Sequence, residues 1–150
     1  MAYENPQGRR LNVLAAAVLD GPARSLHWVS YAGTWRSEHL LRALEELLDD
    51  PAGAGRPTVV VLDNASIHHS RIVHDALPTL ATRGLTLFYL PPYTPELNAI
   101  ERIFRAIKHH HLPERRYTSL DALTIAVDQA FTEYEHELIA KQAHLPRLAA

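Results

Sequence analysis

The chain has 150 residues, an apolar fraction of 47% and a net charge of −2, which together indicate one folded domain with a modest core rather than a disordered chain. It contains no cysteine, which excludes disulfides, thiolate nucleophiles and cysteine zinc sites. No apolar run reaches the roughly 20 residues that span a bilayer and the start holds no apolar signal segment, so we expect a cytoplasmic protein without a membrane partner.

The first half of the chain alternates apolar runs with turn residues. Residues 11–19 form a continuous apolar run, which predicts a buried strand. Residues 25–31 predict a second strand that forms a hairpin with the first across a turn at 20–22. Leucines recur at helical spacing over 37–48, which predicts an amphipathic helix. Residues 58–62 are a short β-branched run and predict another buried strand.

The second half continues this alternation. Residues 69–82 predict a helix that Pro78 kinks or splits, and residues 85–90 predict a strand. Residues 100–110 predict a helix with one apolar face, and a capping box at 118–121 opens a last, long helix. The order strand–strand–helix–strand–helix–strand–helix–helix indicates an α/β layered domain.

Two carboxylates follow predicted strands, where a metal site could form. Asp63 comes directly after a strand, and ligands of parallel α/β sheets gather at the carboxyl ends of strands. Glu101 lies in the first turn of a helix, after a turn stiffened by Pro91, Pro92 and Pro95. Two acids at one end of a sheet suit a pair of divalent metal ions, and such a pair suits phosphodiester chemistry.

Both acids also have simpler interpretations. Asp63 could cap the turn that follows it. Glu101 has the N3 position of a capping box whose N-cap is Asn98. The stiff proline turn favours a functional role for Glu101, because a helix cap alone does not require so preorganised a loop.

Basic residues follow Glu101 on the same predicted helix. Around an α-helix, Arg105 and Lys108 fall within about 60° of Glu101, where they could contact phosphates, as could Arg115 and Arg116 farther along. The alternatives are a solvated helix face and an i,i+4 pair of Arg105 with Glu101. The three histidines at 109–111 point in different directions on a helix, so we interpret them as solvated surface rather than as a metal site.

Two longer motifs carry a family resemblance. Residues 60–68 read VVLDNASIH, and residues 89–102 read YLPPYTPELNAIER. With the flanking sequence over about residues 8–130, they resemble the DDE transposases of the Tc/mariner superfamily, especially the bacterial insertion-sequence branch. Ala99 stands where that family usually has proline.

The resemblance implies a ribonuclease H-like α/β fold with a mixed sheet flanked by helices, and cut-and-paste DNA transposition. It implies dependence on Mg²⁺, with Mn²⁺ as a substitute, and double-stranded DNA, both transposon ends and target, as the partner. It assigns the second and third catalytic, metal-binding carboxylates to Asp63 and Glu101. The DNA contacts that we expect near the site are Asn64, His68, Arg105 and Lys108.

The family's first catalytic aspartate lies on a strand that precedes the one at 11–19, and its helix-turn-helix lies farther toward the amino terminus. We expect residues 1–150 to lack both, since Glu4 and Asp20 are the only acids before Ser37 and neither sits at the end of a strand that precedes the one at 11–19. In the family fold the absent strand is central, between those at 11–19 and 58–62, so these two would lose a shared partner.

We therefore predict a single partial catalytic domain over residues 1–150. It is either inactive alone or dependent on an amino-terminal transposase fragment or a homodimer, so the sequence leaves open whether the chain acts as an enzyme. The alternatives are a non-catalytic DNA-binding or subunit-interaction module with the same fold, and a chain that does not fold stably.

Overall fold

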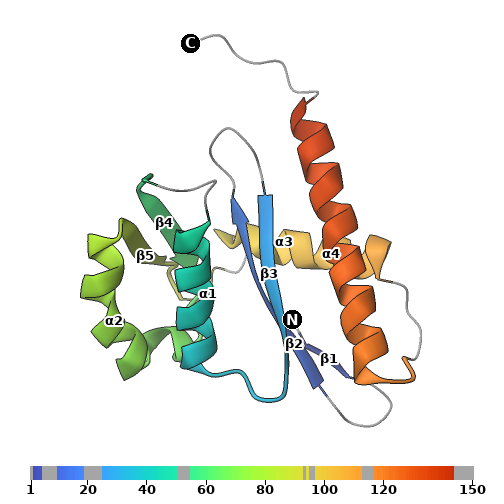
Figure 1. Ribbon diagram of the computed structural model, residues 1–150, viewed down its shortest axis with the longest axis horizontal. Helices are drawn as coiled ribbons and strands as arrows, with labels where there is room; N and C mark the ends of the chain where they lie inside the picture. The colour runs from blue at the N-terminus through green and yellow to red at the C-terminus, as the bar shows by residue number, and fades with distance from the viewer. Residues whose placement is uncertain are drawn as a thin grey trace. The chain divides into compact units, whose positions relative to one another are not determined.

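The computed structural model describes residues 2–4, 10–18, 25–50, 55–92, 94, 97–112 and 117–143, without the side chains of residues 2–4, 142 and 143. The chain divides into two compact units, one of Met1–Gly33 with Arg102–Ala150 and the other of Thr34–Glu101. The elements, coloured along the chain in Figure 1, are β1 (Ala2–Glu4), β2 (Arg10–Val18), β3 (Ser25–Ala32), α1 (Ser37–Asp49), β4 (Thr58–Leu62), the 3₁₀ turn η2 (Ser66–His69), α2 (Arg71–Thr82), β5 (Leu85–Tyr89), α3 (Ala99–Ala106), the π-helical turn η4 (Ile107–His111) and α4 (Leu120–Ala143).

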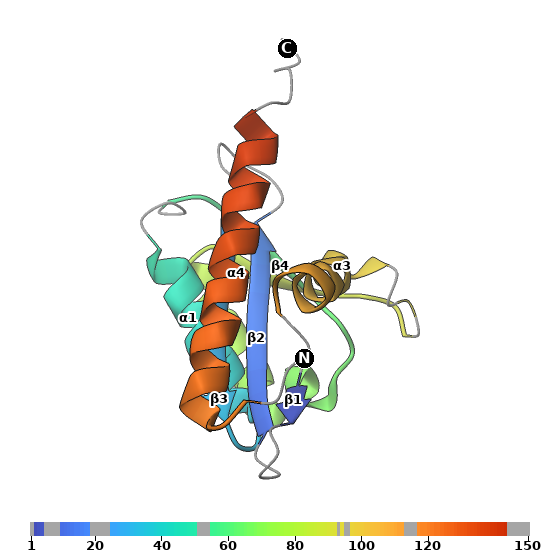
Figure 2. The same ribbon diagram turned by 90° about the vertical axis from the view of Figure 1, so that its right-hand side faces the viewer.

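The first unit is an antiparallel sheet with helix α4 packed on it. The strand order is β1-β2-β3, and β2 pairs with β3 from Leu11 opposite Ala32 to Val18 opposite Ser25. This pairing confirms the predicted hairpin. Helix α4 packs against β3 and β2, and Figure 2 shows it running along them.

Phe131 on α4 lies at the centre of the core of this unit. Its side chain is fully buried, and its ring centroid is 5.4 Å from that of Trp28 on β3. Two hydrogen bonds tie the same helix to the same strand. The Trp28 indole N–H donates to Asp128 Oδ1 at 3.0 Å, and Glu135 Oε1 accepts from the backbone N–H of Leu26 at 2.9 Å. Apolar and polar contacts therefore fix one face of α4 on the hairpin.

The predicted helix at 100–110 ends in a π-helical turn. The backbone N–H of Leu112 donates to the carbonyl of Ile107 at 2.9 Å, one residue farther back than in an α-helix. His111 meets α4 from this turn, with Nδ1 3.4 Å from Glu133 Oε2 and Nε2 3.4 Å from Glu137 Oε1. Its side chain is 10% exposed, so the prediction of solvated surface is wrong for His111. It is correct for residues 109 and 110, which are exposed.

The second unit is a parallel strand–helix–strand layer. Strands β4 and β5 pair in parallel over their whole length. Helix α1 packs on α2, and α2 packs on β5. The buried side chains between these elements include Leu40, Leu44, Val73, Leu80 and Leu85.

The predicted burial of the strand at 58–62 is wrong on one face. Val59 is 64% exposed and Val61 49%, and Phe88 on β5, opposite Val61, is 55% exposed. Side chains of a strand alternate between two faces, and in the described chain helix α2 packs against this pair of strands through β5. The continuous apolar run therefore predicted more side-chain burial than this strand has.

We predicted a mixed sheet that lacks its central strand, and the described strands form two separate sheets. Among the described strands, none pairs with both β2 and β4. The edge of β2 away from β3, where we expected no strand, pairs with β1 over residues 10–12. Glu4 therefore ends a strand, contrary to our expectation. β1 was missed because three residues are too few to show a period.

Three smaller details also differ from the predictions or refine them. Helix α2 continues through Pro78 without being split. It begins at Arg71, whereas the prediction began it at His69. His69 belongs to η2 instead, and Ser70 also lies outside α2. The N-cap of α4 is Ser119 rather than Thr118, because the Ser119 hydroxyl accepts from the backbone N–H of residue 122 at 3.1 Å.

No helix in the described part of the chain has the length and apolar character to cross a membrane.

Replacing Phe131 with alanine should lower the free energy of unfolding by about 3–5 kcal/mol, because the ring is fully buried against Trp28 and Phe104. Urea unfolding followed by tryptophan fluorescence measures the change. Ile125→Ala is the matched control on the same helix. The Ile125 side chain is 58% exposed, so its loss should change the free energy of unfolding little. Equal effects of the two substitutions would contradict this placement of the core.

Candidate functional site

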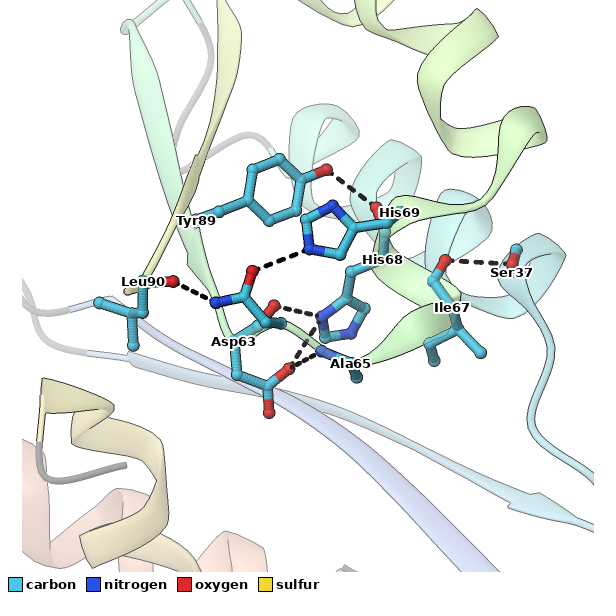
Figure 3. A network of polar contacts seen from close by, with 9 residues as sticks. Ser37, Asp63, Ala65, Ile67, His68, His69, Tyr89 and Leu90 are labelled. Atoms are coloured by element: carbon cyan, nitrogen blue, oxygen red, sulfur yellow. Dashed lines mark hydrogen bonds and ion pairs between the residues drawn. The ribbon is translucent and has the colours of Figure 1, made fainter. Parts of the chain in front are cut away.

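Asp63 lies directly after β4, at the carboxyl end of the strand. Its Oδ1 accepts from the backbone N–H of Ala65 at 3.1 Å and lies 2.9 Å from His68 Nδ1. The first contact is the turn cap that the sequence offered as an alternative, so that interpretation is confirmed. The side chain is 52% exposed, and Figure 3 shows the second carboxylate oxygen pointing away from the loop. The cap therefore occupies one oxygen and leaves the other open to a ligand.

His68 is a buried polar residue beside this carboxylate. Its Nδ1 lies 3.0 Å from the backbone carbonyl oxygen of Asp63, in addition to the contact with Oδ1. Its backbone N–H donates to the Ala65 carbonyl at 2.9 Å within η2. The side chain is only 9% exposed, so the predicted contact with DNA would have to use a small surface.

Asn64 and its neighbours tie this loop to the end of β5. The Asn64 amide donates to the Leu90 carbonyl, and its Oδ1 lies 2.9 Å from His69 Nε2. The His69 ring stacks on Tyr89 with centroids 4.4 Å apart, and the Tyr89 hydroxyl donates to the His68 carbonyl at 2.9 Å, as Figure 3 shows. The loop after β4 is thus held to the adjacent strand.

Tyr89 and His69 were missed by the sequence reasoning. Burial raises the pKa of the Tyr89 phenol, so the hydroxyl stays protonated and remains a donor at neutral pH. Tyr89 ends β5 opposite Leu62, the residue that ends β4. The sequence signal that could have pointed to Tyr89 is its place at the end of a predicted strand. Residues at the ends of neighbouring parallel strands meet at one edge of the sheet.

Glu101 is exposed in the first turn of α3. Its backbone N–H donates to the Asn98 carbonyl at 3.1 Å, which places Asn98 at the predicted N-cap position. Asp63 and Glu101 belong to the same compact unit. That both bind one pair of ions stays a prediction. Within the described residues, no group of three or more His, Asp or Glu side chains is placed to hold a metal ion.

Arg105 and Lys108 are both exposed, but they lie on different kinds of turn. Arg105 is in the last turn of α3, whereas Lys108 is in the π-helical turn. A π turn holds more residues than an α turn, so the angle of about 60° to Glu101, calculated for an α-helix, does not apply to Lys108. Arg115 and Arg116, the rest of the predicted basic stretch, lie outside the described residues.

Comparisons with known proteins bear on both the family and the fold. The sequence model of the DDE superfamily endonuclease family matches residues 2–124. Among solved structures, this chain is similar to a chain of the simian T-cell lymphotropic virus intasome in complex with PP2A regulatory subunit B56 gamma, with a TM-score of 0.55 and 17% sequence identity. The similarity covers 100% of this chain and 54% of that one, so these 150 residues span about half its length. A search of curated proteins finds no match.

At 17% identity the structural likeness shows the fold alone, a mixed α/β fold with four helices and two small sheets among the described residues. The family match is broader evidence, because it runs from β1 into α4 and includes both Asp63 and Glu101. This protein therefore belongs to the DDE superfamily endonucleases.

Proposed function

We propose that this chain is a partial catalytic domain of a DDE transposase from the bacterial insertion-sequence branch of the Tc/mariner superfamily. Family membership supports DNA cleavage as the class of reaction. The observation that carries the proposal is the Asp63 carboxylate, which stands at the carboxyl end of a parallel strand with one oxygen held and the other exposed.

The donor chemistry of the two acids fits Mg²⁺, with Mn²⁺ as a substitute. Asp63 and Glu101 both offer carboxylate oxygens, which Mg²⁺ prefers, and both are exposed enough to leave room for the water ligands that Mg²⁺ keeps. When bound, a metal pair activates water or a DNA 3′-hydroxyl and stabilises the leaving oxygen. Asp63 and Glu101 would hold these ions.

The basic side chains of the chain would bind the DNA backbone. Arg105 and Lys108 are exposed cations and can contact phosphates without reading the base sequence. Asn64 is a weaker candidate, because both ends of its amide are already engaged in the loop. The proposed partner is double-stranded DNA, both transposon ends and target.

The family resemblance implies a third acid ligand on a further strand. Among the described strands, β4 pairs only with β5, and β1 covers the edge of β2 only at residues 10–12. We propose that an amino-terminal transposase fragment or a second subunit supplies a strand that carries an aspartate. Alone, the chain would then cleave DNA poorly.

A non-catalytic DNA-binding or subunit-interaction module is the second candidate. It is favoured by the contact of Asp63 Oδ1 with the Ala65 N–H, which gives this acid a structural task independent of any metal. The two candidates differ in whether Asp63 and Glu101 bind divalent cations.

In a supercoiled-plasmid assay with Mg²⁺ or Mn²⁺, the chain alone should give weak nicking or none, because two carboxylates leave a metal pair short of ligands. Gel electrophoresis of the plasmid forms measures this. Strong nicking that Asp63→Ala abolishes would contradict the prediction. If Glu4→Gln then also abolished it, the third acid would be assigned to β1.

Titration calorimetry with Mn²⁺ separates the two candidate functions. Asp63→Asn and Glu101→Gln should each weaken binding by at least about tenfold, since even the loss of an outer partner of a metal ligand costs that much. Asp75→Asn is the matched control, because Asp75 is an exposed acid of the same unit that lies 3.7 Å from Arg71. Unchanged binding in both test variants favours the non-catalytic module.

Arg105→Ala and Lys108→Ala should each reduce the slope of log K against log salt concentration for DNA binding by about 0.9, which is the effect of losing one phosphate contact. Fluorescence anisotropy with labelled duplex DNA measures the slope. Arg42→Ala, an exposed arginine paired with Glu46 on α1, serves as control and should leave it unchanged. Slopes equal to wild type in both test variants would exclude these two residues from the interface.

A further inference from the structure

We propose that His68 is a positioning residue that orients the Asp63 carboxylate through one N–H shared between two oxygens of Asp63. This inference rests on the proposed function of Asp63 as a metal ligand and adds to it a residue that acts without touching metal or DNA. It changes the role of His68 from the phosphate contact that the sequence suggested.

The partners of the ring determine which nitrogen carries the hydrogen. Nδ1 of His68 lies 2.9 Å from Asp63 Oδ1 and 3.0 Å from the Asp63 carbonyl oxygen. An ionised carboxylate and a backbone carbonyl can only accept hydrogen bonds, so the nitrogen that faces both, Nδ1, must carry the hydrogen. The geometry thus assigns the Nδ1–H form of the imidazole.

The same contacts fix the direction of the carboxylate. Oδ1 has two contacts, a hydrogen bond from the backbone N–H of Ala65 at 3.1 Å and the approach of His68 Nδ1 to 2.9 Å. Rotation of the carboxylate would break both. The second oxygen points away from the loop in Figure 3 and is therefore held in one direction before any ion binds.

The loop around His68 is itself immobilised. Its carbonyl accepts from the Tyr89 hydroxyl, and its backbone N–H donates to Ala65. The next residue, His69, stacks on Tyr89 and meets Asn64, so the two adjacent histidines have separate tasks. His68 holds Asp63, and His69 holds the loop to β5. Since the His68 side chain is only 9% exposed, water competes weakly for its hydrogen bond.

Two substitutions of similar size test the donor. His68→Asn keeps an N–H group near the position of Nδ1, whereas His68→Leu has the same branching and no donor. In Mn²⁺ titrations, we expect His68→Leu to bind about 10–100-fold more weakly than wild type and His68→Asn to retain most of the affinity. Both variants lose the packing of the ring, so their thermal unfolding midpoints should fall by similar amounts. His74→Asn, an exposed histidine on α2, is the control and should match wild type.

Long-range ¹H–¹⁵N NMR spectra of the wild-type chain test the assigned tautomer without any substitution. The expected result is a His68 ring that carries a hydrogen on Nδ1. A ring with its hydrogen on Nε2 would overturn the proposal even if the variants did not fold.

The metal titrations distinguish this inference from the proposed function. If Asp63→Asn abolishes Mn²⁺ binding while His68→Leu binds as wild type does, Asp63 is a ligand and His68 does not position it. If Asp63→Asn binds Mn²⁺ like wild type, the metal role of Asp63 fails, and the positioning role fails with it.

Discussion

The parallel register of β4 on β5 is the constraint on which the candidate site depends. Leu62 lies opposite Tyr89, and the backbone N–H of Leu90 donates to the Leu62 carbonyl at 2.9 Å, so both strands end at one edge. Asp63 and Asn64 leave one strand where Tyr89 and Leu90 end the other. A slip of one residue would turn Tyr89 to the opposite face of the sheet and separate it from His69. The pairing of two five-residue strands thus sets the position of every side chain in the loop.

The sequence was sufficient for most of the elements, because each had a local pattern of its own. Strand β4 and helix α1 came from runs and periods contained within the element, and their ends agree to within a residue. The wrong predictions concern features that depend on residues far apart in the sequence. The π-helical turn ends at His111, whose partners Glu133 and Glu137 lie more than twenty positions along the chain, and no local period encodes that contact. The exposure of Val59 likewise depends on what covers the sheet rather than on the strand itself.

The candidate site, too, could be predicted from the sequence only in part. Asp63 could be singled out because its place after a strand is visible in the sequence, and its cap on Ala65 was a foreseeable alternative. The contacts of His68 were not foreseeable, because only the folded turn brings its Nδ1 close to two oxygens of Asp63. The predicted strand ends place Tyr89 near the loop, but nothing in the sequence indicates that its ring stacks on His69. Proximity to a motif singled out Asp63 and His68, but only the fold shows their contacts.

The division of the chain into units bears on the order in which the protein can fold as it leaves the ribosome. The unit Thr34–Glu101 is continuous, so all its partners are available once it has been synthesised. The other unit is split, and its hairpin emerges about a hundred residues before Asp128, Phe131 and Glu135, the α4 residues that contact Trp28 and Leu26. During that interval the apolar side of a nascent hairpin has no helix to cover it. Translation therefore leaves the hairpin at 10–32 without its partner helix until α4 has been synthesised, and a chaperone would have its best opportunity there.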